Sequence, residues 1–215
     1  DYEKTYSTIR EINHPKYRQV DLSIDFFPEQ QRAGYQASIT LISPENKGVS
    51  TLYLNLPPRV SITSLSTKEG VPLTKAKFDS RHQMAEYHLP GEAVGDTLRL
   101  ELLATKQYLG LSQNEKDSRA DLSVKSLFGS IHSFLPFIGY DKSRELTTDL
   151  QRKEFGLEKR LSRMPSIDDK TAMSNLAISP DALWVSGTVC MSTVAGQQPF
   201  GPGRLVKAWS QNERN

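Results

Sequence analysis

The sequence lacks the features on which several classes of protein depend. Its 215 residues contain one cysteine, Cys190, which excludes an internal disulfide framework. No apolar run approaches the ~20 residues that a membrane-spanning helix needs. There is no excess of one charge either: 27 lysine and arginine residues face 25 aspartate and glutamate residues, with none of the concentrated positive charge typical of nucleic-acid binding. We therefore expect a soluble chain with an ordinary hydrophobic core.

Motifs that indicate particular chemistry are also missing. The sequence has no H-E-x-x-H zinc motif, no Walker phosphate loop, no G-x-G-x-x-G and no G-x-S-x-G turn. The closest pair of its four histidines, His82 and His88, would lie about 20 Å apart along a strand, too far to share a metal ion. The apolar surroundings of Cys190 favour a small buried side chain over a nucleophile. A Ser–His–Asp triad is neither supported nor excluded, because its members converge in space and not in sequence.

The residues that are present favour β-strands. Apolar and polar residues alternate with a period of two in several short segments, and proline- and glycine-containing turns separate them. The predicted strands are Arg18–Phe27, Gly34–Ser43, Thr51–Leu56, Val60–Ile62, Met84–Leu89, Thr97–Ala104, Asp181–Thr193 and Leu205–Trp209. Short alternating strands at this spacing predict a mainly β fold, an antiparallel β-sandwich with one or two short helices.

The helical signals lie in the middle of the chain. Residues 143–155 form one predicted helix, in which Leu146 and Leu150 share a face and Gly156 supplies the stop. A second, shorter helix is predicted from Ser166 to Leu176, because Ser166 and a carboxylate three residues later resemble a capping box.

The charged residues of this middle region have ordinary interpretations. Asp149 and Lys153 are spaced to pair on the first helix, and Asp168–Asp169 would interact with the start of the second. The basic run is interrupted by Glu154 and Glu158, so we interpret it as a solvated helix face. It consists of Arg152, Lys153, Lys159, Arg160 and Arg163.

We expect a single β domain over residues 1–215. Residues 18–105 would form the first sheet region, residues 106–180 a decorated segment with the short helices, and residues 181–215 the returning strands. The chain begins with Asp1, without a methionine or a signal segment, and we expect it to be excised from a longer protein.

One block of sequence resembles a known family. Phe134–Asp141 is followed by Arg144–Leu146, Phe155–Leu157, Arg163–Pro165 and Asp168–Asp169. In this order the segments resemble the N-terminal β domain of the gluzincin aminopeptidases, the group that includes aminopeptidase N and leukotriene hydrolase. The version most similar occurs in bacterial proteins that join an ABC-transporter permease to an aminopeptidase-like module. The resemblance spans about residues 18–215.

The resemblance implies a saddle-shaped β domain that lies against a thermolysin-like catalytic domain and helps to wall its substrate cleft. In that family the zinc ligands, the general-base glutamate and the G-x-M-E-N motif belong to the catalytic domain, so the resemblance implies neither catalysis nor a cofactor in this chain. Family members bind the substrate's free amine partly through a Gln or Glu shortly before the aromatic–Pro block, and residues 126–132 contain neither. The candidate cleft-facing residues are Ser130, His132, Tyr140 and Asp141.

The resemblance therefore implies an accessory domain on the extracytoplasmic face of a bacterial inner membrane. Its partners would be the catalytic-like domain and the membrane segments of the same protein, and the catalytic domain would hold the zinc. The alternative is a free-standing β-sandwich module that recognises a peptide or protein partner, through an open sheet edge or through residues 130–140. An independent hydrolase is the weakest of the three hypotheses, because the expected motifs are missing.

Overall fold

The structure is a computed structural model that describes residues 2–43, 49–93, 97–108, 133–159, 168, 185–201 and 203–215. The chain divides into two compact units. The β unit comprises Asn13–Gly139 and Val185–Asn215, and the helical unit comprises Asp1–Ile12 and Tyr140–Trp184. The expectation of one domain over residues 1–215 stays a prediction.

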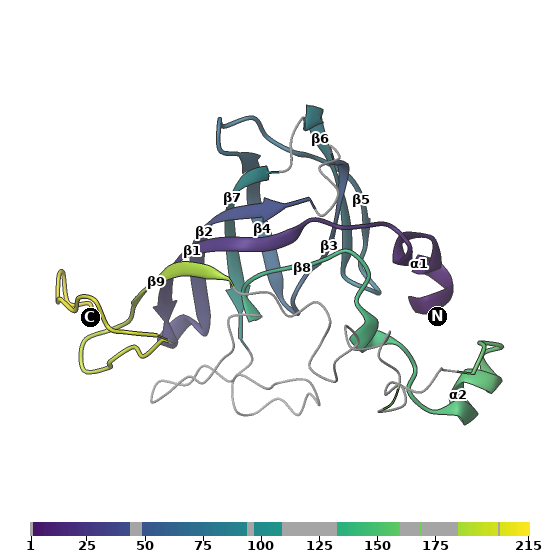
Figure 1. The fold of residues 1–215 in the computed structure, drawn as a ribbon. Coiled ribbons are helices and arrows are strands. Elements are labelled where there is room, and N and C mark those ends of the chain that lie inside the picture. The colour runs from purple at the N-terminus through teal and green to yellow at the C-terminus, as the bar shows by residue number, and fades with distance from the viewer. Residues whose placement is uncertain are drawn as a thin grey trace. The chain divides into compact units, whose positions relative to one another are not determined.

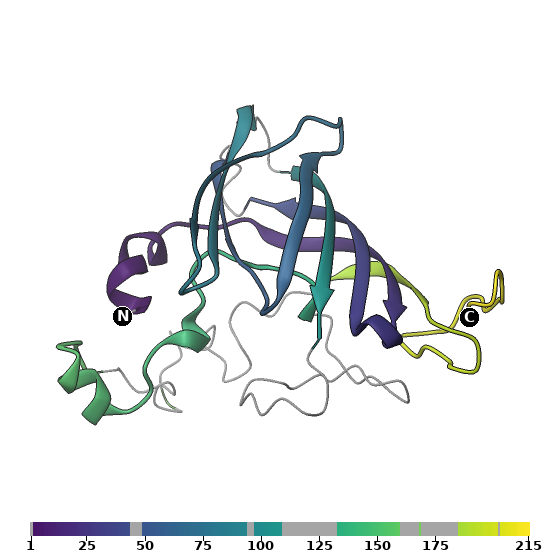
Figure 2. The same cartoon turned by 180° about the vertical axis from the view of Figure 1, so that it is seen from behind.

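The β unit contains two sheets (Figures 1 and 2). The larger sheet has the order β4 (Val60–Thr67), β7 (Thr97–Gln107), β2 (Arg32–Ile42), β1 (Lys16–Phe27), β9 (Ser186–Ser192). The smaller sheet has the order β5 (Thr74–Asp79), β6 (Met84–Ala93), β3 (Val49–Asn55), β8 (Phe137–Ile138). Together they confirm the predicted mainly β, sandwich-like fold with few helices.

Neighbouring strands pair antiparallel, with one exception. The exception is β9, which runs parallel to β1 from the Gln19–Ser186 pair to the Asp25–Ser192 pair. A parallel partner requires a long connection, and here more than 150 residues separate the two strands.

The core is built from the alternation seen in the sequence. On β1 the residues Val20, Leu22 and Ile24 are at most 4% exposed, whereas their polar neighbours face outward. Leu52 and Leu54 on β3, in the smaller sheet, belong to the same hydrophobic cluster. Burial of one face of each sheet explains why these strands could be predicted from their period of two.

The C-terminal strand prediction was wrong in part. β9 lies within the predicted Asp181–Thr193 strand, but no strand forms at Leu205–Trp209. Instead, the chain beyond β9 pairs with the last residues of the sequence: the Thr193 N–H donates to the Asn215 carbonyl at 2.9 Å, and the Ala195 N–H donates to the Glu213 carbonyl at 3.0 Å. Residues 205–209 themselves lie outside both sheets.

The helical unit contains α1 (Tyr2–Arg10), a short 3₁₀ turn η3 (Lys142–Arg144) and α2 (Asp149–Glu154). The predicted helix over 143–155 is therefore interrupted. The Asp141 side chain caps η3, and the chain is extended at Glu145 and again at Thr148, just before α2. Gly156, with a φ of +63°, follows α2 as predicted.

The predicted faces of α2 were also wrong. Leu150, expected on an apolar face, is 80% exposed, whereas Arg152, expected in solvent, is 7% exposed. Asp149 contacts Lys159 at 3.2 Å and not Lys153. The second predicted helix, Ser166–Leu176, lies outside the described residues apart from residue 168. None of the helices in the described part of the chain has the length and apolar character needed to span a bilayer.

Candidate functional site

The Phe134–Asp141 block is divided between the two units after Gly139. In the β unit, Phe134 is 4% exposed and its ring makes edge-on contacts with the rings of Phe26, at 6.1 Å, and Tyr35, at 5.3 Å. Residues 137–138 form β8 and pair with β3. This part of the block is thus a structural element of the sandwich, because both its main chain and its aromatic ring are used in packing.

Side chains from three neighbouring strands hold the main chain of residues 133–136. The Lys106 Nζ on β7 donates to the carbonyl of residue 133 at 3.0 Å. The Tyr35 hydroxyl on β2 donates to the carbonyl of residue 134 at 2.7 Å, and the Tyr17 hydroxyl on β1 donates to that of residue 136 at 2.6 Å. We call Tyr17, Tyr35 and Lys106 the clasp. It satisfies carbonyl groups that would otherwise be buried without donors.

The segment ends at a position that only glycine fits. Gly139 has a φ of +79°, and a Cβ atom built there would overlap the His14 ring. Its N–H donates to the Tyr53 carbonyl at 2.9 Å, and its own carbonyl accepts from the Asn55 Nδ2 at 2.6 Å. The conformation of Gly139 therefore fixes the path of the chain as it leaves β8.

Lys106 is an unusual member of this core. It is 8% exposed, and its ammonium group contacts the Pro58 carbonyl at 3.4 Å and the rings of Tyr108 and Phe134 at 5.6 and 6.0 Å. Burial, and to a smaller extent the positive charge of Arg59, lowers the pKa of Lys106 to about 8. Carbonyl oxygens and ring faces stabilise the ammonium group less than water does, so part of the desolvation cost remains.

Raising the pH from 8 to 9 is expected to stabilise the protein. The unfolded chain holds the Lys106 proton up to its ordinary pKa of 10.5, whereas the folded protein releases it near pH 8, so unfolding takes up protons in this window. Above about pH 9 the gain is offset and then reversed, because six buried or half-buried tyrosines resist the ionisation that begins in the unfolded chain as the pH approaches their ordinary pKa of 10.0. They are Tyr17, Tyr35, Tyr53, Tyr87, Tyr108 and Tyr140. We expect a gain on the order of 1 kcal/mol after allowance for solvent screening. Urea unfolding across this range measures it, and a rise that persists unchanged in Lys106→Met would refute the assignment.

Removing one hydroxyl of the clasp is expected to destabilise the β unit. Tyr35→Phe leaves the carbonyl of residue 134 without its donor while preserving the ring contact with Phe134. The expected loss is about 1 to 2 kcal/mol, measured by thermal or urea unfolding. Tyr53→Phe is the matched control, because the Tyr53 side chain takes no part in the clasp. Equal losses for the two variants would show that the clasp has no special role.

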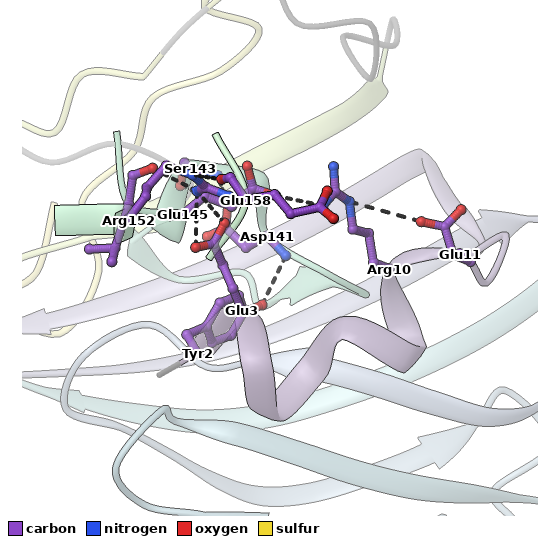
Figure 3. Close-up of polar contacts among 10 residues, drawn as sticks. Tyr2, Glu3, Arg10, Glu11, Asp141, Ser143, Glu145, Arg152 and Glu158 are labelled. Atoms are coloured by element: carbon purple, nitrogen blue, oxygen red, sulfur yellow. Dashed lines mark hydrogen bonds and ion pairs between the residues drawn. The ribbon is translucent and has the colours of Figure 1, made fainter. Parts of the chain in front are cut away.

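In the helical unit, the candidate residues Tyr140 and Asp141 both contact Tyr2 of α1. Figure 3 shows Asp141 beside this helix. The Tyr140 ring, 7% exposed, lies 5.2 Å from the ring of Tyr2. The Asp141 N–H donates to the Tyr2 hydroxyl at 2.9 Å, and its carboxylate accepts from the Ser143 N–H at 2.9 Å and hydroxyl at 2.6 Å. The Asp141 carboxylate is therefore used to cap the next turn.

Two ion pairs surround these residues. The Arg152 Nη1 donates to the two carboxylate oxygens of Glu3 at 2.7 and 3.1 Å, and both side chains are 8% exposed. The same guanidinium donates to the carbonyls of Leu146 at 2.9 Å and Glu158 at 2.7 Å. These contacts join α1, α2 and the segments on both sides of α2 (Figure 3).

The second pair lies closer to Tyr140. The Arg10 Nη1 is 3.8 Å from the buried carboxylate of Glu145. Burial, with the negative charges of Glu145 and Glu3, raises the pKa of Tyr140, and the hydrogen bond to Glu3 raises that of Arg152. At neutral pH the Tyr140 hydroxyl is already protonated and the Arg152 guanidinium already charged, and the two shifts favour these states. The cluster is thus suited to holding elements together and poorly suited to proton transfer.

The other residues selected from the sequence are scattered. Ser130 and His132 lie outside the described residues. His82, 8% exposed, contacts Asp79 at 2.7 Å in the turn before β6, and Cys190 is half-buried on β9. Within the described ranges no group of three or more His, Cys, Asp and Glu side chains is arranged to hold a metal ion.

An open hollow of about 340 Å³ lies on the outer face of the larger sheet, beside Gly34. The one charged residue in its described lining, Asp25, accepts a hydrogen bond from the Ser192 hydroxyl and lies 3.8 Å from Arg214. Because that charge is paired within the protein, the described lining of the hollow offers no unpaired charge to a ligand.

Sequence reasoning missed α1 and its ion pair with α2. The signal was present, since Tyr2, Tyr6 and Ile9 follow helical spacing and two of them are buried. The partner of Glu3 could not be found in this way, because Arg152 is 149 residues distant and belongs to a run of basic residues that resembles a solvated surface.

Comparison with known proteins gives a fold-level result. No protein-family model matches the sequence, and no curated protein matches it. The structure is similar to a mutant M1 zinc metallopeptidase from Deinococcus radiodurans bound to a Tyr-Ser-Ala substrate, with a TM-score of 0.51 and 15% identity over 94% of this chain and 38% of that chain. A yeast LTA4 hydrolase in complex with bestatin matches 42% of this chain and 14% of its own, with a TM-score of 0.34 and 12% identity. Only the first similarity is strong enough to indicate a shared fold, and this chain spans about 38% of that metallopeptidase's length.

Proposed function

We propose that the chain is a non-catalytic β domain of an aminopeptidase-related protein, which packs against a zinc-peptidase-like domain and helps to wall its cleft. The observation that supports this proposal is the fold similarity over 94% of the chain to little more than a third of a zinc metallopeptidase. The sequence of the Phe134–Asp141 block and of the segments that follow it, which resembles the same group of enzymes, supports the proposal as well.

The contacts of the Phe134–Asp141 block support a structural role. Between Phe134 and Gly139 it is held by the clasp and by β3, and the Asp141 carboxylate caps a turn. Side chains that take part in such contacts are poorly placed to act on a substrate, whereas they hold the surface of a domain in a fixed form. The reacting groups and the zinc would then belong to the partner domain.

The narrower resemblance, to bacterial proteins that join an ABC-transporter permease to an aminopeptidase-like module, supports a location for the parent protein. We propose that the parent protein joins this domain to an ABC-transporter permease in a bacterial inner membrane, with the domain on the extracytoplasmic face. The sequence of the coding region on both sides of residues 1–215 tests this directly. An H-E-x-x-H motif with a downstream glutamate and several membrane spans are expected there.

A binding experiment tests the packing role. The peptidase-like domain encoded beside this chain, purified separately, is expected to bind the 215-residue chain in a calorimeter. A coding region that ends near residue 215, with no peptidase-like domain and no membrane span on either side, would contradict the proposal. That result would favour the free-standing peptide-binding module.

A further inference from the structure

The edges of the two sheets are not equally protected against further strand pairing. Beyond β4 the chain folds back along its edge: the Thr67 N–H donates to the Val71 carbonyl at 2.8 Å, and the Leu73 N–H donates to the Leu65 carbonyl at 2.9 Å. β5 carries Lys75 and Lys77 with a register shift between them, and β8 is two residues long. Proteins usually block the edge of a sheet by covering it, by placing charged residues on it, by making its pairing irregular or by keeping the edge strand short.

In the described part of the chain β9 lacks most of these protections, although the segment that follows it contacts its last residues, Met191 and Ser192. Its residues, Ser186–Ser192, include no charge and no proline, and they pair with β1 without a register shift. No described strand lies on its other side. The sequence carries no charged side chain anywhere between residues 182 and 203. A regular, neutral edge of this kind is a template for an additional strand.

Exposed apolar side chains lie in the segments that precede and follow β9. The segment that follows β9, yellow in Figure 1, belongs to the same unit, and a Cβ atom on its Gly201 would meet the Met191 side chain of β9 at 2.9 Å. The large exposed apolar residues in this part of the chain are Val185 (49%), Phe200 (82%), Leu205 (75%), Val206 (83%) and Trp209 (53%). Together they present on the order of 500 Å² of apolar surface, at the upper end for a monomer and approaching the ~800 Å² per partner of a stable interface.

We propose that β9 pairs antiparallel with β9 of a second copy of the chain, forming a two-fold dimer in which the apolar residues of the 200–209 segment are covered. Neutrality favours a second copy, because an edge with no charge can lie against itself without like-charge repulsion. A two-fold interface is also closed, so pairing stops at the dimer. The apolar area supplies the stabilisation that main-chain hydrogen bonds alone do not provide. This proposal is independent of the proposed function.

The test is the mass of the full 215-residue chain in solution as a function of concentration. Sedimentation equilibrium between about 5 and 500 μM is expected to show a shift from 24.2 kDa to twice that mass. Thr188→Lys places a lysine on the exposed part of β9, next to Asp21 of the same chain, and should weaken dimerisation at least ~10-fold without loss of the folded state. Ala76→Lys adds the same charge to β5 and should leave the dimer unchanged.

The outcomes are distinct. A chain that stays monomeric at the highest concentration overturns the proposal, as does a dimer that Thr188→Lys does not weaken. If Thr188→Lys does not fold, hydrogen exchange of the unmodified protein decides: the β9 amides are expected to gain protection with concentration, and unchanged exchange overturns the proposal. A monomer that instead binds an extended peptide along β9 would overturn it in favour of peptide recognition.

Discussion

Gly187→Ala is expected to separate β9 from β1 and to lower the free energy of unfolding by about 3 kcal/mol. A Cβ atom on Gly187 would overlap the carbonyl oxygen of Val20, which belongs to the backbone of the neighbouring strand. A flexible side chain could move aside, but a ladder carbonyl cannot move without breaking the pairing. Urea unfolding measures the loss, and hydrogen exchange shows whether it is confined to β9 and the β1 residues beside it.

Gly34→Ala is the matched control on the central strand β2. Its backbone lies outside the left-handed region, and the nearest atom to an added Cβ is 3.9 Å away on Phe27. A change within about 0.5 kcal/mol is expected. If Gly187→Ala unfolds like this control, β9 does not pair with β1 as described.

Arg152→Met is expected to release α1 from the helical unit. The substitution leaves the Glu3 carboxylate buried without its cation and removes donors from the carbonyls of Leu146 and Glu158. An isolated helix of nine residues is unstable in water, so α1 depends on its contacts with the rest of the helical unit, of which this buried ion pair is one. Exchange protection of the α1 amides should fall ~100-fold or more.

Two further variants separate charge from packing. Lys153→Met removes an exposed cation from the same helix and should leave α1 protected. The double variant Glu3→Met with Arg152→Met removes both buried charges and should recover part of the protection, because the uncompensated carboxylate is gone. Loss of protection in the Lys153 variant, or none in the Arg152 variant, would show that the ion pair does not hold α1.

The strands that could be predicted from sequence are those with one buried face. Val20, Leu22 and Ile24 alternate with polar residues because the two sides of β1 meet different surroundings. β5 was missed for the same reason: residues 74–78 are all exposed, so burial imposes no period on the sequence. The alternation is equally compatible with parallel and antiparallel neighbours, which is why the parallel pairing of β9 could not be foreseen.

The candidate site was harder to predict, because its contacts span the chain. The aromatic–Pro block was recognised from its sequence, but its donors Tyr17, Tyr35 and Lys106 lie on three strands between 27 and 119 residues away. In the sequence Lys106 resembles an ordinary strand residue. It becomes a donor to a buried carbonyl only because the chain returns to it at residue 133. Long-range side-chain contacts of this kind leave no local periodicity.

The question on which the proposed function depends is whether this chain provides shape alone or also performs chemistry. It is answered by incubating the purified 215-residue chain with zinc, removing the excess, and measuring both the bound metal and the hydrolysis of a panel of fluorogenic aminoacyl substrates. We expect less than stoichiometric zinc and no turnover above the rate of the buffer. One zinc ion per chain together with aminopeptide hydrolysis would contradict the account.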